Sequence, residues 1–384
     1  MHILCVSPDI APYGHSPAAV LSTGLSKALR QQKHEVTLIS PLYPTIDPKQ
    51  LSLARRLDSI HVAMGSHHHD FNVYDGRTTS GVQTVFLENN TLFNDPYSPC
   101  ADNTESNVLQ FVFFSAAVSQ WLEHKNDTFS LVHAHDWPTA LAVILTKHRY
   151  PHLPTLYTIY DLQHQGRLPE VMLTALGLNN EPFTKDLIYG GSLNFMAAGL
   201  QYADRIVTTT TSQATAILKE PDAHGLSLAL ARRSTPPIGI RRGIDDSIWN
   251  PSTDRLIPAP YDASDVAGKL RCKTKLQTTY GLELRTDIPL LTVVLPPEPS
   301  SSDKLIHDML PALLRNDIQV LIAQPDHTID HASWEDLTTR FNDHVKIASP
   351  SESTPVNAWL AGSDFILLLP GSNSSDLHLK ALRY

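Results

Sequence analysis

Cysteine, clustered basic charge and long apolar runs are all scarce in this sequence of 384 residues. Its three cysteines, Cys5, Cys100 and Cys272, lie far apart, which argues against a disulfide framework or a cysteine-based metal site and favours a reducing compartment. No run of about 18 apolar residues is present, so we expect no membrane-spanning helix. Lysine and arginine cluster only in pairs and the net charge is −9, which argues against a nucleic-acid-binding surface.

The sequence also lacks a charged leader and a signal-peptide core, because Met1 leads directly into an apolar strand pattern. We therefore expect a cytoplasmic protein. Histidine, by contrast, is abundant, and residues 67–69 are three consecutive histidines on an expected loop. Three adjacent loop histidines lack the convergent geometry that a metal site needs, so we predict neither a metal site nor a cofactor.

Residues 130–166 are the most informative stretch and predict a strand-helix-strand unit. A short apolar run ends at residue 132, residues 133–137 form a polar turn, and residues 139–147 have helical spacing. A β-branched and aromatic strand follows at residues 154–159 and ends at a second polar cluster. Both polar clusters therefore follow carboxyl ends of parallel strands, where open α/β sheets bind ligands.

A structural interpretation of the same residues stays open. Asp136 suits the N-cap of the helix that follows it, and Trp137 suits packing. His133 and His135 suit loop histidines that are hydrogen-bonded within the protein.

The two polar clusters carry a resemblance to a known family. HAHDWPTAL and YTIYDLQHQG resemble the H-C-H-D-W-H-T-A-L and F-T-I-H-N-L-A-Y-Q-G segments of bacterial glycogen synthases and plant starch synthases. The resemblance implies that His135 keeps a position of the catalytic set. It also implies ligand-binding positions at Asp136, Trp137 and Gln165.

The resemblance extends along most of the chain, more strongly before residue 280. It includes the opening strand and first helix, a loop that contains Tyr97, and a hinge at residues 241–254. A second α/β pattern of four apolar strands starts near residue 286. We therefore predict the α/β fold called GT-B, with two doubly wound Rossmann-type domains facing a cleft. The expected parts are an N-terminal domain at 1–240, a hinge at 241–285 and an incomplete second domain at 286–384.

Several departures from the family fall on ligand-binding positions of the first domain and of the start of the hinge. His15 stands at the lysine of the family's glycine-rich loop, and Pro17 lacks the NH group with which a glycine would approach a phosphate. Tyr160 and Asp161 replace the histidine and asparagine of F-T-I-H-N. Arg242 replaces the asparagine before the hinge glycine.

The second domain departs further. Transfer of glucose from a nucleotide-sugar leaves a negatively charged diphosphate, which the synthases hold with an arginine and a lysine after the first strand. Residues 286–303 of this chain contain neither, and Lys304 is the nearest substitute. The family's glutamate after the fourth strand is also missing, because no glutamate follows Glu352.

The expected strand order leaves the strand that begins at Asp364 and ends at Leu369 at an edge of the second sheet. We expect an apolar strand in that position to pair with a second copy or with a partner protein.

Three functions follow from these observations. The first is a catalytically inactive synthase-like protein that keeps an α-glucan or partner surface. The second is an active ADP-glucose:α-1,4-glucan glucosyltransferase of glycogen biosynthesis. The third is a transferase for a different nucleotide-sugar, with a phosphate site formed by His15, Arg242 and Lys304.

Overall fold

The computed structural model describes residues 1–14, 16–95, 104–125, 129–160, 162–295, 301–323, 331–348, 355–369 and 376–384. It divides into two compact units, Met1–Arg242 and Gly243–Tyr384. Of the predicted hinge at residues 241–285, residues 243–285 lie in the second unit. Among the described helices, none combines the length and the apolar character that crossing a membrane requires.

The first unit is built on a nine-stranded sheet in the order β12-β11-β7-β6-β1-β2-β5-β4-β3. Its strands are β1 (His2–Val6), β2 (Glu35–Pro41), β3 (Ala54–Met64), β4 (His67–Arg77), β5 (Gln83–Glu88), β6 (Leu131–His135), β7 (Thr155–Ile159), β11 (Arg205–Thr208) and β12 (Ile238–Gly239). All neighbours from β12 to β5 pair in parallel. The strand order reverses beside β1, which makes the carboxyl ends of β1 and β6 the switch point of a doubly wound fold.

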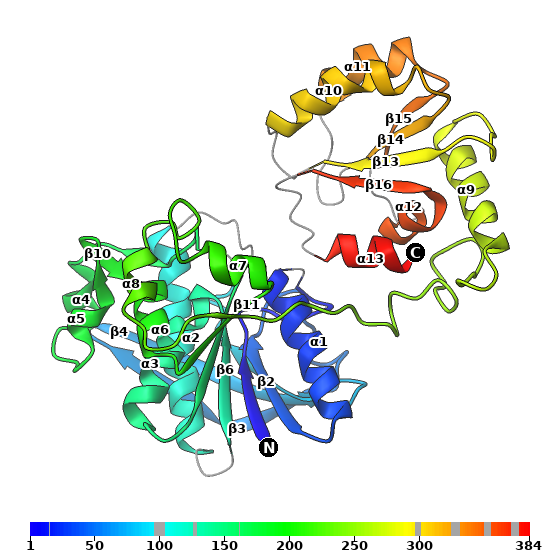
Figure 1. The fold of residues 1–384 in the computed structure, drawn as a ribbon. Helices are drawn as coiled ribbons and strands as arrows, with labels where there is room; N and C mark the ends of the chain where they lie inside the picture. The colour runs from blue at the N-terminus through cyan, green and yellow to red at the C-terminus, as the bar shows by residue number, and fades with distance from the viewer. Residues whose placement is uncertain are drawn as a thin grey trace. The chain divides into compact units, whose positions relative to one another are not determined.

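Helices cover both faces of this sheet. They are α1 (Pro17–Gln31), α2 (Glu105–Glu123), α3 (Ala140–Arg149), α4 (Met172–Ala175), α5 (Thr184–Leu187), α6 (Phe195–Tyr202), α7 (Thr211–Ala216) and α8 (Ser227–Ala231). A small sheet of β8 (Arg167–Leu168), β10 (Ser192–Asn194) and β9 (Ile188–Tyr189) lies outside the main one. Figure 1 shows α1 on one side of the large sheet and α2, α3 and α6 on the other.

The alternation of side chains along β1 defines the two faces. Leu4 and Val6 join the large core formed with α2, α3 and α6, whereas Cys5 joins the smaller core on the α1 side. The pairing register places Cys5 beside His133 of β6. Because paired residues in a parallel sheet point to the same face, the odd-numbered histidines of β6 lie on the α1 side.

The hairpin of β3 and β4 was not predicted, and its position corrects the expectation for residues 67–69. The three histidines lie in strand β4, and His69 packs with its ring centroid 4.3 Å from that of Phe113. Much of β3 is exposed on both faces, so it has little of the apolar alternation by which strands are recognised. Pairing of the two strands shifts register between Arg55 and Ser59, which is an irregularity of the bulge type.

The second unit has a four-stranded parallel sheet in the order β15-β14-β13-β16. Its strands are β13 (Leu290–Val294), β14 (Gln319–Ala323), β15 (Val345–Ala348) and β16 (Phe365–Leu368), and its helices are α9 (Ala267–Tyr280), α10 (Ser301–Leu313), α11 (His331–Arg340), α12 (Val356–Gly362) and α13 (Leu377–Arg383). In Figure 1, α10 and α11 lie on one face and α9, α12 and α13 on the other. Within the described residues β16 is an edge strand, in the predicted order.

Helix ends follow their sequence signals. Ser16 caps α1, since its hydroxyl oxygen accepts a hydrogen bond from the Ala19 NH group, and Pro17 occupies the first helical position. Helix α9 ends at Gly281 in a left-handed conformation.

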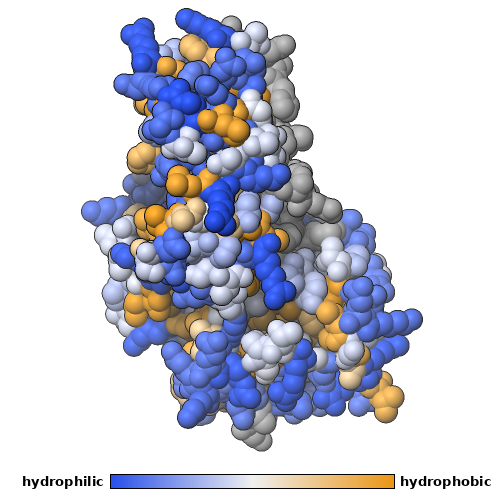
Figure 2. Space-filling view, turned by 90° about the vertical axis from the view of Figure 1, so that its right-hand side faces the viewer, coloured by the Kyte–Doolittle hydropathy of each residue, from blue (hydrophilic) through white to orange (hydrophobic). Residues whose placement is uncertain are grey.

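On the face drawn in Figure 2, apolar residues are scattered among hydrophilic ones, which is usual for a protein surface.

Candidate functional site

The candidate site lies where β1, β6 and β7 end, at the switch point of the large sheet. His135 is the last residue of β6 and pairs with Thr158 of β7. Tyr160 follows the end of β7, and Cys5 lies in the neighbouring strand β1. The sequence predicts His135 and Tyr160 at this edge, and the structure brings them together.

Both ring nitrogens of His135 have protein partners. Its Nδ1 lies 2.7 Å from the Tyr160 hydroxyl oxygen, and its Nε2 lies 3.2 Å from the Cys5 sulfur. Only 1% of His135 is exposed. His135 is therefore hydrogen-bonded within the protein, as the structural interpretation of the sequence expects. Sequence reasoning did not identify its partner Cys5, which is 130 residues away along the chain.

His133 forms a second layer behind His135. The two rings stack with centroids 4.2 Å apart, and His133 Nε2 lies 2.7 Å from the Thr158 hydroxyl. Burial lowers the pKa of His133 to about 4. Burial also lowers the pKa of His135 far below its usual range, and repulsion between the two imidazoles when both are protonated adds to the effect. Both imidazoles are therefore neutral at pH 7, and neither offers positive charge to a diphosphate.

Several charged groups of the site act electrostatically on the Tyr160 hydroxyl. Burial raises the pKa of its hydroxyl well above the usual value, the charge of Asp136 raises it further, and Arg242 acts in the opposite direction. Asp136 and Arg242, two further predicted positions, thus lie within electrostatic range of Tyr160. The backbone oxygen of Tyr160 accepts a hydrogen bond of 2.5 Å from the Gln213 amide.

Asp136 has an unusual backbone conformation, with φ at 63° and ψ at 177°. This region suits glycine, and another residue there costs about 1 to 3 kcal/mol, a strain found most often at functional sites. The predicted N-cap is wrong in detail, because Asp136 precedes a 3₁₀ turn at Trp137–Thr139 and its side chain makes no capping hydrogen bond. Its backbone oxygen instead accepts hydrogen bonds from the NH and hydroxyl groups of Thr139.

Two predicted ligand positions have structural roles in this arrangement. Trp137 is buried, packs edge-on against Phe111 at 5.4 Å between centroids, and closely contacts Gly166. Gln165 is 2% exposed. Its amide nitrogen donates to the carbonyls of Leu162 and His224, and its oxygen accepts from Asn194 and Arg167. These contacts use the hydrogen-bonding capacity that a ligand would need.

The turn between β1 and α1 adds a carboxylate that the sequence interpretation missed. Asp9 is 2% exposed and accepts hydrogen bonds from the hydroxyl and the NH group of Ser16. Burial raises the pKa of Asp9 to about 6, against the lowering effect of the two Ser16 hydrogen bonds. The sequence signal that could have revealed Asp9 was its position shortly after β1, a strand of the switch point.

The remaining predicted positions are His15, Tyr97, Asp161 and Lys304. His15, Tyr97 and Asp161 lie outside the described residues. Lys304 is an exposed residue of α10 in the second unit. Among the described residues, no group of three or more His, Cys, Asp or Glu side chains is arranged to hold a metal ion.

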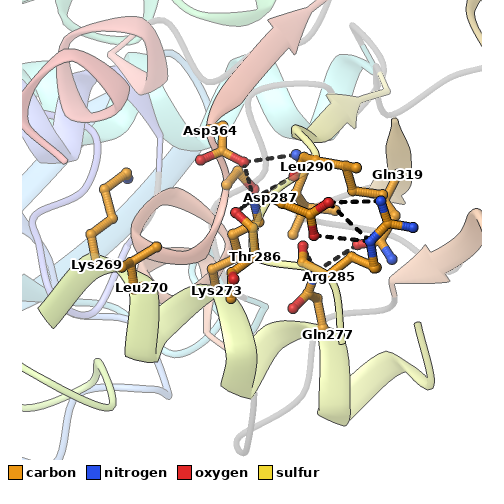
Figure 3. Close-up of polar contacts among 12 residues, drawn as sticks. Lys269, Leu270, Lys273, Gln277, Arg285, Thr286, Asp287, Leu290, Gln319 and Asp364 are labelled. Atoms are coloured by element: carbon orange, nitrogen blue, oxygen red, sulfur yellow. Dashed lines mark hydrogen bonds and ion pairs between the residues drawn. The ribbon is translucent and has the colours of Figure 1, made fainter. Parts of the chain in front are cut away.

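Buried cations of the second unit are engaged in structural contacts, as Figure 3 shows. Lys273 Nζ lies 2.7 Å from Asp364 Oδ2 and also donates to the carbonyl of Ile288. Asp364 in turn accepts the NH group of Leu290, the first residue of β13. This pair therefore lies at the amino ends of β13 and β16, opposite to the edge where ligands bind in such sheets.

Arg285 makes a similar structural contact on the same unit. It forms ion pairs with Asp287 and Asp317 at 2.7 and 3.0 Å (Figure 3). Both carboxylates come from segments that precede strands β13 and β14. Arg285 is therefore also placed away from the carboxyl edge of the second sheet.

Comparisons with known proteins agree with the predicted family resemblance. Residues 2–232 match the family model for the starch synthase catalytic domain. Glycogen synthase 2 of Geobacter metallireducens is 31% identical over 333 residues, which cover 84% of this chain and 68% of that protein. Glycogen synthase of Clostridium novyi is also 31% identical, over 334 residues with the same coverage.

A solved structure matches the fold over nearly all of the chain. It is the catalytic domain of starch synthase IV from Arabidopsis thaliana, bound to ADP and acarbose, with a TM-score of 0.80 and 22% identity. The match covers 95% of this chain and 77% of that one. The predicted α/β fold of the GT-B type is thereby confirmed.

Proposed function

Since this chain belongs to the starch synthase catalytic domain family, we propose that it is a synthase-like protein that has lost glucosyl transfer from ADP-glucose. Its role in this proposal is to bind an α-glucan or a partner protein through the first unit. The observation that carries the proposal is the state of His135. The imidazole is buried and neutral, and its two nitrogens contact Cys5 and Tyr160.

The chemistry of the second unit supports the same conclusion. A departing diphosphate needs cationic groups at the carboxyl edge of the nucleotide-side sheet, and their loss raises the barrier by several kcal/mol. Residues 286–303 contain no lysine or arginine. Lys273 and Arg285 do not replace them, because their ion pairs lie toward the opposite edge of the sheet.

A direct assay tests the proposed loss of activity. The purified chain of 384 residues is incubated with radiolabelled ADP-glucose and glycogen, and a bacterial glycogen synthase serves as positive control. We expect no incorporation above background, and no gain on Tyr160→His, which restores only one family residue. Incorporation at rates near those of the control contradicts the proposal.

Glucan binding is tested separately, by electrophoresis in native gels with and without glycogen. Retardation of the chain by glycogen supports the glucan-binding form of the proposal. Unchanged mobility removes that form and favours a partner protein that binds the first unit.

The position of Arg242 favours a second candidate function, transfer from a different nucleotide-sugar. Arg242 acts electrostatically on Tyr160, which places one guanidinium within electrostatic range of the switch point. Calorimetry with UDP-glucose and ADP-glucose tests this candidate, with Arg242→Ala and Lys304→Ala as variants and Arg241→Ala as the matched control. Binding that is lost only in the first two variants supports it, and absence of binding in the wild type excludes it.

A further inference from the structure

Two histidines and a carboxylate lie together on the outward face of the hairpin formed by β3 and β4. His61 pairs with Asp70 across the hairpin, and the next pair on that face is Ala63 with His68. All four residues are exposed. Diagonal neighbours on one face of a sheet have Cβ atoms about 7 to 8 Å apart or less, within reach of long side chains. The two imidazoles do meet, since their rings stack with centroids 6.0 Å apart.

The other two histidines of the consecutive tract lie on the opposite face of β4. His67 and His69 alternate with His68, and their ring centroids lie 5.8 and 4.3 Å from that of Phe113 in α2. Burial lowers the pKa of His69, in agreement with this packed position. The alternation of the strand therefore divides the tract, and of its three members only His68 shares a face with His61.

The carboxylate determines which nitrogen of His61 can bind a ligand. His61 Nδ1 lies 2.5 Å from Asp70 Oδ1. An ionised carboxylate only accepts hydrogen bonds, so a neutral His61 carries its proton on Nδ1 and keeps a lone pair on Nε2. Histidines that ligate metals are usually held in this way, because the carboxylate orients the ring and makes the ligating nitrogen more basic.

We propose that His61 and His68 bind a divalent transition-metal ion such as Zn²⁺, with Asp70 orienting His61 and water completing the coordination. Imidazole nitrogen suits Zn²⁺, Cu²⁺ and Ni²⁺, whereas Mg²⁺ prefers oxygen ligands. Both rings are exposed and change rotamer readily, so one nitrogen of each can turn toward the same ion.

The number of protein ligands in this site is two. This agrees with the finding that, over the part of the chain that the structure describes, three or more His, Cys, Asp or Glu side chains are nowhere arranged to hold a metal ion. Because the two ligands come from neighbouring strands, the bound ion ties the outermost strand β3 to β4. The inference does not depend on the proposed function.

Isothermal titration calorimetry on the chain of 384 residues tests the proposal at pH 7.5, with ZnCl₂ as the probe and MgCl₂ as the oxygen-preferring control. We expect Zn²⁺ to bind and Mg²⁺ to give no binding heat. His61→Gln and His68→Gln each remove a ligand and should weaken zinc binding by more than about tenfold. Asp70→Asn keeps both ligands and removes the orienting charge, so it should weaken binding by about tenfold.

The inward pair of the tract provides the matched control. The double variant His67→Gln with His69→Gln removes two imidazoles from the same strand, and we expect its zinc affinity to equal that of the wild type. A loss in this double variant as large as the loss in His61→Gln overturns the proposal, because binding then belongs to the consecutive tract. Absence of zinc binding by the wild type, or unchanged binding in His61→Gln, also overturns it.

A measurement on the unaltered chain decides the matter if a variant fails to fold. Diethyl pyrocarbonate modifies accessible imidazole nitrogens, and mass spectrometry of the peptides measures the modification at each histidine. Zinc should protect His61 and His68, whereas the exposed His152 should react equally with and without zinc. Equal modification of His61 in the two conditions contradicts the proposed site.

Discussion

Substitution of Gly166 by alanine should destabilise the first unit strongly. Gly166 has φ at 61°, and an added Cβ atom would lie 2.4 Å from Cε3 of the Trp137 indole. An L-residue in the left-handed region costs about 1 to 2 kcal/mol. Forcing a methyl group against a packed ring adds about 1 to 3 kcal/mol. The expected loss for Gly166→Ala is therefore about 2 to 5 kcal/mol of unfolding free energy.

The chain supplies a matched control for the backbone part of this loss. Gly190 has φ at 65°, and a Cβ atom there would have no heavy atom within 4 Å among the neighbours considered. Gly190→Ala should therefore cost only the left-handed penalty, about 1 to 2 kcal/mol. Urea denaturation, followed by circular dichroism and tryptophan fluorescence, measures both variants against the wild type.

A double-mutant cycle identifies the clash itself. Trp137→Phe shortens the ring at the contact, so Gly166→Ala should cost at least 1 kcal/mol less in the Trp137→Phe background than in the wild type. Costs of Gly166→Ala and Gly190→Ala that agree within about 0.5 kcal/mol would refute the contact with the indole as the origin of the loss.

Three further predictions concern ionisable groups. Because burial lowers the folded-state pKa of His133 to about 4 from 6.5, the unfolded state binds the extra proton first, and the wild type should lose about 2 kcal/mol relative to His133→Asn between pH 7.5 and pH 5. Urea titrations at the two pH values should show that His133→Asn lacks this loss. Asp9 has the opposite sign, since its folded-state pKa is raised to about 6 from 3.8, so the wild type should lose about 2.5 kcal/mol relative to Asp9→Asn as the pH rises from 4 to 7.5. Equal pH profiles of variant and wild type would contradict either assignment. Lys273→Met should cost about 3 to 5 kcal/mol in thermal or urea unfolding, because it removes the buried partner of Asp364, while the exposed Lys304→Met changes stability by less than about 0.5 kcal/mol.

Much of the parallel framework was predictable from local sequence. Apolar runs at the positions of β6, β7 and β13 through β16 alternate with helical spacing, and this pattern indicates a parallel sheet. The strand order of the second unit follows from the general topology of doubly wound folds. The edge at which His135 and Tyr160 meet could be predicted for the same reason.

The partners within the site could not be predicted, because they are distant in sequence or lie in irregular turns. Cys5 reaches His135 only through the pairing of β1 with β6. Asp9 and Ser16 meet through a turn whose backbone path has no periodic pattern. The role of Gln165 likewise depends on contacts with residues as far along the chain as His224.

The register shift in β3 has a consequence for the behaviour of the protein in solution. An outermost strand with an even row of NH and carbonyl groups is a template on which another molecule can add a strand. In β3 the row is broken between Arg55 and Ser59, within a run of charged side chains. We expect growth of the nine-stranded sheet to stop there, so that concentrated protein resists fibril formation from this end of the first unit.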